Sequence, residues 1–163
     1  MFANTVMKRA FSTAAKNRVA FLGVGNMGKS MVLNLQKNGF EVKAYDVFPA
    51  ARKAAEESGV YVADSLEECV KDVDYCVSAL PMTAHVQEAM ATAFANAAPG
   101  TMFLDASTIL PKVSIELAEI AEANGMVFMD TPMSGGILGA KMGTLSFMCG
   151  GSDANLATAM PVL

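Results

Sequence analysis

Short apolar runs separated by helical patterns recur along the whole chain. The runs expected to form strands are Val19–Leu22, Val42–Tyr45, Tyr61–Val62, Tyr75–Leu80, Met102–Leu104, Met126–Met129 and Leu145–Met148. Among them, Tyr75–Leu80 is a continuous apolar run of the kind found in strands buried on both faces. Strands that alternate with helices predict an α/β fold with a doubly wound parallel sheet.

Helical patterns fill most of the segments between these runs. They are expected over Gly28–Gly39, Pro49–Gly59, Ser65–Val70, Thr83–Asn96, Pro111–Asn124 and from Ser152 on to Leu163. The buried side of the helix that begins at Pro111 is expected to carry Val113, Ile115, Leu117, Ile120 and Ala121. The stretch Met133–Ala140 is expected to be a loop.

The first apolar run breaks into a Gly-x-Gly-x-x-Gly turn, Gly23-Val24-Gly25-Asn26-Met27-Gly28. Gly23 permits a tight turn, Gly25 lets the backbone approach a pyrophosphate, and Gly28 lets the following helix lie close to the sheet. The unpaired N–H groups and the positive dipole end of that helix then face the phosphates. The turn predicts a dinucleotide site, and the alternative is a glycine-rich turn before an ordinary surface helix.

An acid follows the second apolar run at the place where such a site needs one. Asp46 lies 18 residues after Gly28, near the spacing of about 20 for the acid that binds the adenosine ribose. A carboxylate accepts hydrogen bonds from a ribose 2′-hydroxyl and repels a 2′-phosphate. Asp46 therefore predicts NAD rather than NADP as the cofactor.

Composition narrows the choice of function classes. The net charge of −4 and the lack of a basic cluster in the body of the chain argue against nucleic-acid binding. The three cysteines, Cys69, Cys76 and Cys149, are scattered, and the chain has one histidine. This pattern predicts neither a zinc site nor a disulfide framework, and we expect the cysteines to be small buried hydrophobic residues. No stretch reaches the roughly 20 apolar residues of a membrane span.

The first 17 residues differ in kind from the rest. They contain Lys8, Arg9 and Lys16 with two hydroxyl residues, and the first acid of the chain is Glu41. A basic, hydroxylated and acid-poor segment is typical of a mitochondrial transit peptide, and a disordered tail is the alternative. We therefore expect residues 1–17 to direct the protein to the mitochondrial matrix and residues 18–163 to form one dinucleotide-binding domain.

Ligands of an open parallel sheet bind beyond the carboxyl ends of its strands, so the residues at those ends are candidates. Leu80–Pro81 is expected beside the cofactor, or is a simple strand-ending turn. Thr108 either donates its hydroxyl on the nicotinamide side or caps the helix near Pro111. Ser134, Gly135 and Gly136 expose successive N–H groups and a hydroxyl that can hold a substrate carboxylate, with a flexible turn as the alternative.

Two separate motifs in the right order make the chain resemble the β-hydroxyacid dehydrogenase family from Arg18 to Leu163. The matching residues are Phe21–Gly28, Tyr45–Pro49, Leu80–Pro81, Asp105–Thr108, Asp130–Gly136 with Gly139–Ala140, Gly143–Leu145 and Gly150–Gly151. The resemblance implies an NAD-binding half and a hydroxyacid site at the loop Ser134–Gly136. It also implies that His85 matches a polar cofactor contact of relatives, most of which have asparagine there; a surface helix histidine is the alternative.

The resemblance implies NAD-dependent oxidation of 3-hydroxyisobutyrate to methylmalonate semialdehyde, a step of valine breakdown. In the family a lysine acts as general base, on a helix that is expected beyond Leu163; Lys141 does not match it and is expected to be a solvated surface residue. The family's helical second domain, which builds a homo-oligomer, is also expected to be missing. This chain is therefore expected to be the cofactor-binding part and to be inactive alone.

Two other functions remain open at this point. One is an NADPH-dependent glyoxylate or succinic semialdehyde reductase of the same family, which Asp46 argues against. The other is a non-catalytic dinucleotide-binding module. The lack of a base lysine favours such a module, whereas the carboxylate-binding loop Ser134–Gly136 argues against it.

Overall fold

The computed structural model describes residues 17–163, which form an α/β domain around a six-stranded parallel sheet. The strand order is β3-β2-β1-β4-β5-β6. The strands are β1 (Arg18–Leu22), β2 (Glu41–Tyr45), β3 (Tyr61–Val62), β4 (Tyr75–Ser78), β5 (Met102–Asp105) and β6 (Val127–Asp130). This order reverses at β1, so the prediction of a doubly wound parallel sheet is confirmed.

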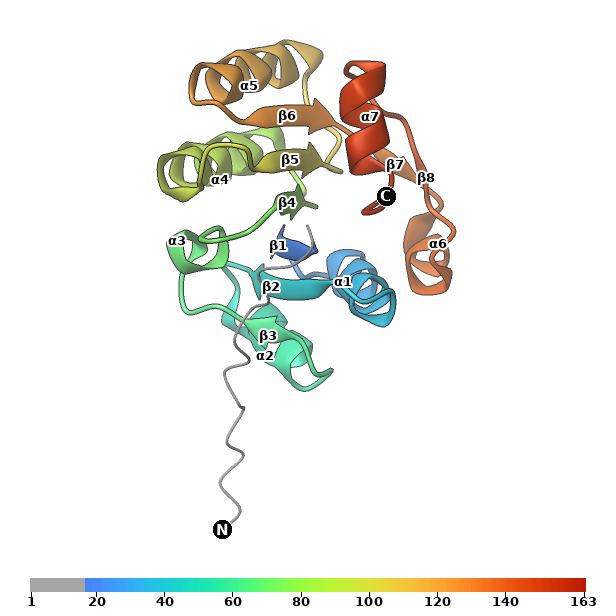
Figure 1. Cartoon of the computed structure of the whole chain (residues 1–163). Coiled ribbons are helices and arrows are strands. Elements are labelled where there is room, and N and C mark those ends of the chain that lie inside the picture. The colour runs from blue at the N-terminus through green and yellow to red at the C-terminus, as the bar shows by residue number, and fades with distance from the viewer. Residues whose placement is uncertain (1–16) are drawn as a thin grey trace.

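Helices cover both faces of the sheet (Figure 1). One face is packed by α1 (Gly28–Lys37), α2 (Pro49–Glu56), α6 (Gly136–Met142) and α7 (Asp153–Ala159). The other is packed by α3 (Leu66–Cys69), α4 (Thr83–Asn96) and α5 (Pro111–Ala123). The sheet is therefore the middle of three layers, and its two faces carry two separate apolar clusters.

The alternation of side chains along a strand explains why the central strands are apolar throughout. In β1, Val19 and Phe21 contact the α1 side, whereas Ala20 and Leu22 contact the α4 side. All four residues of β4 are buried, which confirms the prediction of a strand enclosed on both faces. Central strands buried in this way fix the positions of the loops at their carboxyl ends.

The helix α5 corrects one prediction about burial. Val113, Leu117 and Ala121 are buried as expected, but Ile115 and Ile120 are 61% and 49% exposed. The buried residues lie four apart and so form one narrow stripe, and the two isoleucines lie outside it. The contact between α5 and the sheet is therefore narrower than the apolar pattern indicated.

The C-terminal part of the chain corrects two further predictions. The expected loop at Met133–Ala140 is instead a short strand, β7 (Met133–Ser134), followed by α6. The last helix begins at Ser152 as expected, since the Ser152 hydroxyl accepts a bond from the Asn155 N–H at 3.2 Å. It ends at Ala159 and does not run to Leu163, because Pro161 has no N–H to donate and disfavours helix before it.

A small antiparallel sheet adds to the parallel one. Strand β7 pairs with β8 (Ser146–Phe147), with Met133 opposite Phe147 and Ser134 opposite Ser146. The expected strand Leu145–Met148 therefore exists, but it is shorter, and it runs antiparallel to β7 instead of joining the parallel sheet. The pairing of β7 with β8 places Ser134 two residues before the first residue of α6.

The cysteines fit the expectation of small buried hydrophobic residues at two of three positions. Cys69 and Cys76 are buried, and Cys149 is half-buried. Burial raises the pKa of the Cys69 thiol to about 12 and raises that of Cys76 as well. Thiols held in this protonated state are poor nucleophiles and poor metal ligands.

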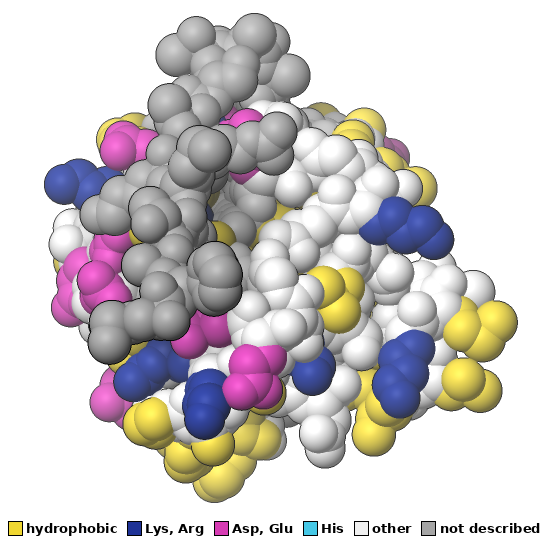
Figure 2. Space-filling model, turned by 90° about the horizontal axis from the view of Figure 1, so that it is seen from below, with side chains coloured by type: hydrophobic (Ala, Val, Ile, Leu, Met, Phe, Trp, Pro, Cys, Tyr) yellow, Lys and Arg dark blue, Asp and Glu magenta, His cyan; other side chains and the backbone are white. Residues whose placement is uncertain are grey.

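Surface charges of both signs are interspersed with small groups of apolar side chains on the face seen in Figure 2. Within residues 17–163, no helix is both long and apolar enough to cross a bilayer. The same part of the chain holds no group of three or more His, Cys, Asp or Glu side chains suited to a metal ion.

Candidate functional site: the carboxyl edge of the sheet

The strand register brings the expected ligand-binding segments to one edge of the sheet. Leu22 of β1 lies opposite Tyr45 of β2 on one side and Ser78 of β4 on the other. Asp105 of β5 lies between Ser78 and Asp130 of β6. The glycine turn, Asp46, Leu80–Pro81, Thr108 and Ser134 follow these strand ends directly or within a few residues. They therefore share the carboxyl edge, where ligands of open parallel sheets bind.

The first and third glycines of the turn are required by protein contacts. Gly23 has φ +94°, and a Cβ there would lie 2.5 Å from the Ala79 carbonyl oxygen. A Cβ on Gly28 would collide with the carbonyl oxygen of Gly23. Gly23 therefore makes the tight turn, and Gly28 lets α1 start close against it.

Gly25 differs from both, because a Cβ at this position would meet no protein atom within 4 Å. It is exposed, and no packing or backbone strain requires a glycine there. The space beside it is open for a ligand that approaches the backbone closely. This arrangement fits a pyrophosphate, and it is the strongest single indication of a cofactor site.

The start of α1 offers backbone donors to such a ligand. Its N-cap residue, Met27, gives no side-chain cap. The N–H groups of Asn26, Met27 and Gly28 have no acceptor within residues 17–163. Unpaired N–H groups at the positive end of a helix favour an anion.

Asp46 is held against the glycine turn by two backbone donors. Its Oδ2 accepts the Val24 N–H at 2.9 Å, and its Oδ1 accepts the Phe48 N–H at 2.9 Å. Each oxygen keeps a further lone pair for a ligand hydroxyl. Arg52 donates to the Asp46 carbonyl oxygen at 2.6 Å, and its guanidinium lies 5.7 Å from the centre of the Tyr45 ring.

The nicotinamide-side candidates lie on two adjacent loops. Pro81 and Thr108 are exposed, and Leu80 is half-buried. Thr108 does not cap α5, because the N-cap residue is Leu110 and no side chain caps the helix. His85 is exposed in the first turn of α4. The capping interpretation of Thr108 is therefore wrong, and Thr108 is an exposed residue of the loop after β5.

Ser134, Gly135 and Gly136 form the junction between β7 and α6. Gly135 has φ +132° and Gly136 has φ +63°, conformations that favour glycine. All three residues are exposed. The expected donors therefore lie at the start of the helix α6 instead of in a loop. Their successive backbone N–H groups can still be presented to an anion. Lys141 is exposed near the end of α6, as expected.

Two polar residues at strand ends were not selected from the sequence. Ser78 and Asp105 are fully buried, and the Ser78 hydroxyl donates to Asp105 Oδ1 at 2.7 Å. The signal available in the sequence is a polar residue inside an otherwise apolar strand. Their partnership depends on the pairing of β4 with β5, which the sequence alone does not specify.

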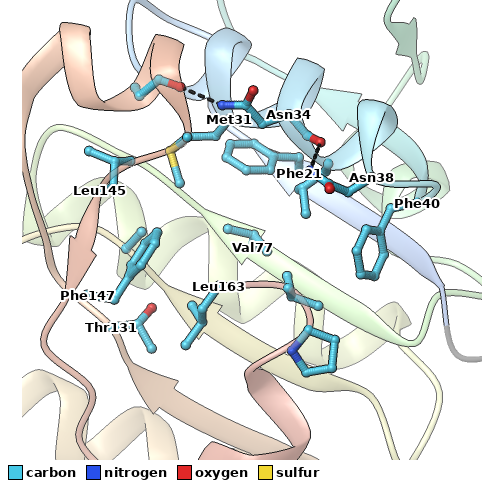
Figure 3. A pocket seen from close by; sticks show the side chains of 16 residues that line it. Phe21, Met31, Asn34, Asn38, Phe40, Val77, Thr131, Leu145, Phe147 and Leu163 are labelled. Atoms are coloured by element: carbon cyan, nitrogen blue, oxygen red, sulfur yellow. Dashed lines mark hydrogen bonds between the residues drawn. The ribbon is translucent and has the colours of Figure 1, made fainter.

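A cavity of about 140 Å³ lies between α1, β8 and the last three residues of the chain. It is lined mainly by apolar side chains, and Figure 3 shows Phe21, Leu145, Phe147 and Leu163 around it. The glycine turn and Asp46 do not line it. Pockets that hold small-molecule ligands measure about 300–1,000 Å³. This cavity is smaller than that range and is therefore too small for a dinucleotide. The cofactor candidate is therefore the open edge of the sheet.

Comparisons with known proteins agree with this geometry. The profile of the NAD binding domain of 6-phosphogluconate dehydrogenase matches residues 18–163. The mitochondrial 3-hydroxyisobutyrate dehydrogenase of Mus musculus is 41% identical over 155 residues, which are 93% of this chain and 46% of that protein. The chain thus spans about half the length of the curated relatives it matches.

Solved structures give the same result. The 3-hydroxyisobutyrate dehydrogenase of Mycobacterium tuberculosis, determined with L-serine, matches with a TM-score of 0.88 and 40% identity, over 91% of this chain and 51% of that one. The 3-hydroxyisobutyrate dehydrogenase of Salmonella typhimurium matches with a TM-score of 0.83 and 27% identity, over 90% and 52%. The chain therefore belongs to the NAD-binding domain family of 6-phosphogluconate dehydrogenase and is similar to the corresponding half of 3-hydroxyisobutyrate dehydrogenases.

Proposed function

We propose that this chain is the cofactor-binding part of an NAD-dependent dehydrogenase that oxidises 3-hydroxyisobutyrate to methylmalonate semialdehyde. The observation that carries the proposal is the pairing of Gly25, which has open space where a Cβ would lie, with the Asp46 carboxylate beside it. A pyrophosphate fits the first and a ribose diol fits the second. The relatives named above support the choice of substrate.

Asp46 is the basis for choosing NAD over NADP. Its two oxygens are already oriented by the Val24 and Phe48 N–H groups, so little freedom is lost when a ribose diol binds. A 2′-phosphate at the same place faces a fixed negative charge. Arg52 is the nearby cation, but its guanidinium is engaged with the Asp46 carbonyl oxygen and the Tyr45 ring.

The substrate is proposed to bind at Ser134, Gly135 and Gly136. The N–H groups of this junction and the Ser134 hydroxyl are suited to a carboxylate. L-Serine, present in the M. tuberculosis structure, carries a hydroxyl on the carbon next but one to its carboxyl carbon, as does 3-hydroxyisobutyrate. The shared chemistry supports a short β-hydroxy acid at this junction.

The bound cofactor supplies a hydride acceptor at its nicotinamide ring. The chain's part is to orient: α1 holds the phosphates, Asp46 holds the ribose, and Ser134–Gly136 holds the carboxylate. The hydroxyl proton must pass to a base, and the resemblance gives that role to a lysine of the family.

Calorimetric titration with NAD and with NADP tests the cofactor assignment. We expect wild type to bind NAD more tightly than NADP. Asp46→Asn should weaken NAD binding by about tenfold, the cost of one hydrogen bond to a charged group. It should also reduce the preference for NAD over NADP. Glu57→Gln removes an equal charge from the exposed end of α2 and serves as the control. A wild-type preference for NADP would favour the reductase alternative.

A second titration tests the substrate site. NAD binding should become tighter in the presence of 3-hydroxyisobutyrate, and Ser134→Ala should reduce that effect. Ser146→Ala changes the exposed serine paired with Ser134 across β7 and β8 and should leave the effect intact. If the hydroxyacid has no influence on NAD binding, the non-catalytic dinucleotide-binding module becomes the better account.

Mitochondrial import through residues 1–17 also stays a proposal, because residues 1–16 lie outside the described part of the chain. The basic, acid-poor composition of the segment supports it, as does the mitochondrial designation of the mouse relative. Fusion of residues 1–17 to a fluorescent protein should direct the fusion to mitochondria. Diffuse fluorescence throughout the cell would contradict the proposal.

A further inference from the structure

A row of polar side chains crosses the carboxyl edge of the sheet on the α4 side. Ser78, Asp105 and Asp130 are successive partners in the register of β4, β5 and β6. Asp105 is fully buried, and its Oδ1 accepts the Ser78 hydroxyl at 2.7 Å and the Ser107 N–H at 3.1 Å. Its Oδ2 is buried without a partner within the described residues. A buried carboxyl group with one satisfied oxygen requires an explanation.

The hydrogen bonds continue from Asp105 to a second loop. The Ser107 hydroxyl, itself buried, accepts the Leu80 N–H at 2.9 Å. The chain of contacts therefore runs from Asp105 through Ser107 to Leu80 and joins the loop after β5 to the loop after β4. These two loops carry Thr108 and Pro81.

We propose that Asp105 is a positioning residue whose Oδ1 fixes the loops that carry Leu80–Pro81 and Ser107–Thr108 in the arrangement that receives the nicotinamide end of the cofactor. The inference rests on the proposed function for its link to the cofactor, whereas the coupling of the two loops stands on the hydrogen bonds alone. Asp105 acts through Ser107, and it is not a catalytic residue.

The chemistry of the site indicates that acceptance by Oδ1, and not negative charge, is what the fold uses. Burial raises the pKa of Asp105 against the effect of the Ser107 and Ser78 bonds, and the neighbouring Asp130 raises it further. No cation pairs with Asp105 within residues 17–163. Both hydrogen bonds that reach the Asp105 side chain use Oδ1 as an acceptor, a role that a carboxyl oxygen can fill without carrying a charge. An asparagine side chain has nearly the same shape and offers the same carbonyl acceptor.

Amide hydrogen exchange measured by NMR on the full chain without ligand tests the coupling. Asp105→Ala should make the Ser107 amide exchange at least about tenfold faster, because that amide loses its acceptor. It should speed exchange of the Leu80 amide as well, because the Ser107 hydroxyl that accepts it is no longer held in place. Asp105→Asn should keep both rates near those of wild type. Thr101→Val removes a buried hydroxyl that donates to the Val73 carbonyl oxygen at the opposite end of β5, and it should change neither rate.

Ser107→Ala keeps the test decisive if Asp105→Ala does not fold. It removes only the acceptor for Leu80, so the Leu80 amide should exchange faster while the Ser107 amide stays protected. An unchanged Leu80 rate in whichever of these variants folds would overturn the proposal. Equal acceleration in Asp105→Asn and Asp105→Ala would overturn it as well, because the amide would then fail to replace the carboxyl acceptor.

Titration with NAD then tests the link to the cofactor. Asp105→Ala should weaken NAD binding by about tenfold, which corresponds to the loss of one hydrogen bond that holds the two loops in place. Asp105→Asn should bind NAD about as tightly as wild type. If the loops loosen and NAD affinity does not change, the positioning role is wrong although the coupling is real. If wild type binds no NAD, the proposed function fails, and the exchange rates still decide whether Asp105 couples the loops.

Discussion

At the scale of single residues, an ion pair ties the start of β1 to the loop before β4. The Arg18 guanidinium contacts both oxygens of Asp74 at 3.1 Å, and the Arg18 N–H donates to the same carboxylate. Both side chains are largely shielded from solvent, with 27% and 13% exposure. Burial raises the pKa of Asp74, but the Arg18 bonds together outweigh it and hold the pKa below its usual value.

Replacement of Asp74 by asparagine should lower the free energy of unfolding at neutral pH by about 2 kcal/mol, the range for hydrogen bonds to charged groups. Because the folded-state pKa is lowered, the contribution is present above the unfolded pKa near 3.8 and is lost as pH falls through the folded pKa. Urea unfolding at several pH values measures this. The difference between wild type and Asp74→Asn should shrink in acid.

Asp72→Asn provides the matched control for that experiment. Asp72 is exposed and lies two residues before Asp74, and its replacement by asparagine removes the same charge. It forms no ion pair within the described part of the chain. A loss of stability in Asp72→Asn equal to that in Asp74→Asn would show that net charge, and not the Arg18 contact, is responsible.

At the scale of elements, a side-chain hydrogen bond joins α6 to α1. The Asn34 side chain of α1 donates to the Ala140 carbonyl oxygen of α6 at 2.7 Å (Figure 3). A Cβ on Gly143, just after α6, would also contact the Asn34 side chain at 3.5 Å. This contact therefore sets the orientation of the helix whose start carries the proposed carboxylate site.

Asn34→Ala should make the α6 amides exchange about tenfold faster, since a hydrogen bond of roughly 1 kcal/mol is lost. NAD affinity should not change, because the Asn34 side chain donates to α6 and not to the glycine turn. The effect of 3-hydroxyisobutyrate on NAD binding should weaken. Asn38→Ala is the control, since the side chain of Asn38, the C-cap of α1, donates to the Asn34 carbonyl oxygen and not to α6. Unaltered exchange in α6 after Asn34→Ala would contradict this account.

The elements also show how far the sequence determines the fold. The run at β4 predicted a strand because burial on both faces demands apolar residues. The helix α4 was predicted over Thr83–Asn96 from its alanine-rich sequence and from Pro99–Gly100 after it. The helix α6 was not predicted, because its glycines have low helix propensity. The contact of α6 with α1 through Asn34 compensates for this low propensity. Asn34 and Ala140 are 106 residues apart in the sequence, so their contact cannot be recognised from neighbouring residues.

The candidate site divides in the same way. The glycine turn and Asp46 are recognisable in the sequence because the strand, turn, helix and acid follow one another within 30 residues. The network of Ser78, Asp105 and Ser107 with Leu80 is not recognisable, because it exists only once β4 and β5 are neighbours. The exposure of Ile115 likewise depends on how much of α5 the sheet covers.

At the scale of the whole molecule, apolar side chains remain exposed on α6 and near it. Leu138 and Met142 lie one turn apart on α6 and are 68% and 66% exposed. Met148, just after β8, is 58% exposed. Exposed apolar groups of this kind promote association.

We therefore expect the chain to self-associate at high concentration. Leu138→Lys with Met142→Lys should shift sedimentation velocity profiles toward the monomer. Ile115→Lys changes an equally exposed apolar residue on α5 and should leave the association unchanged. A wild-type chain that sediments as a monomer at high concentration would contradict the expectation.

The central claim is that the open space beside Gly25 holds the pyrophosphate of NAD. Calorimetric titration of wild type and Gly25→Ala with NAD tests it most directly, because a Cβ at Gly25 meets no protein atom within 4 Å and the backbone there is unstrained. Gly25→Ala should unfold at the same temperature as wild type and bind NAD at least about tenfold more weakly, a loss of about 1.4 kcal/mol. Equal NAD affinity in the two proteins, or binding by neither, would contradict the claim.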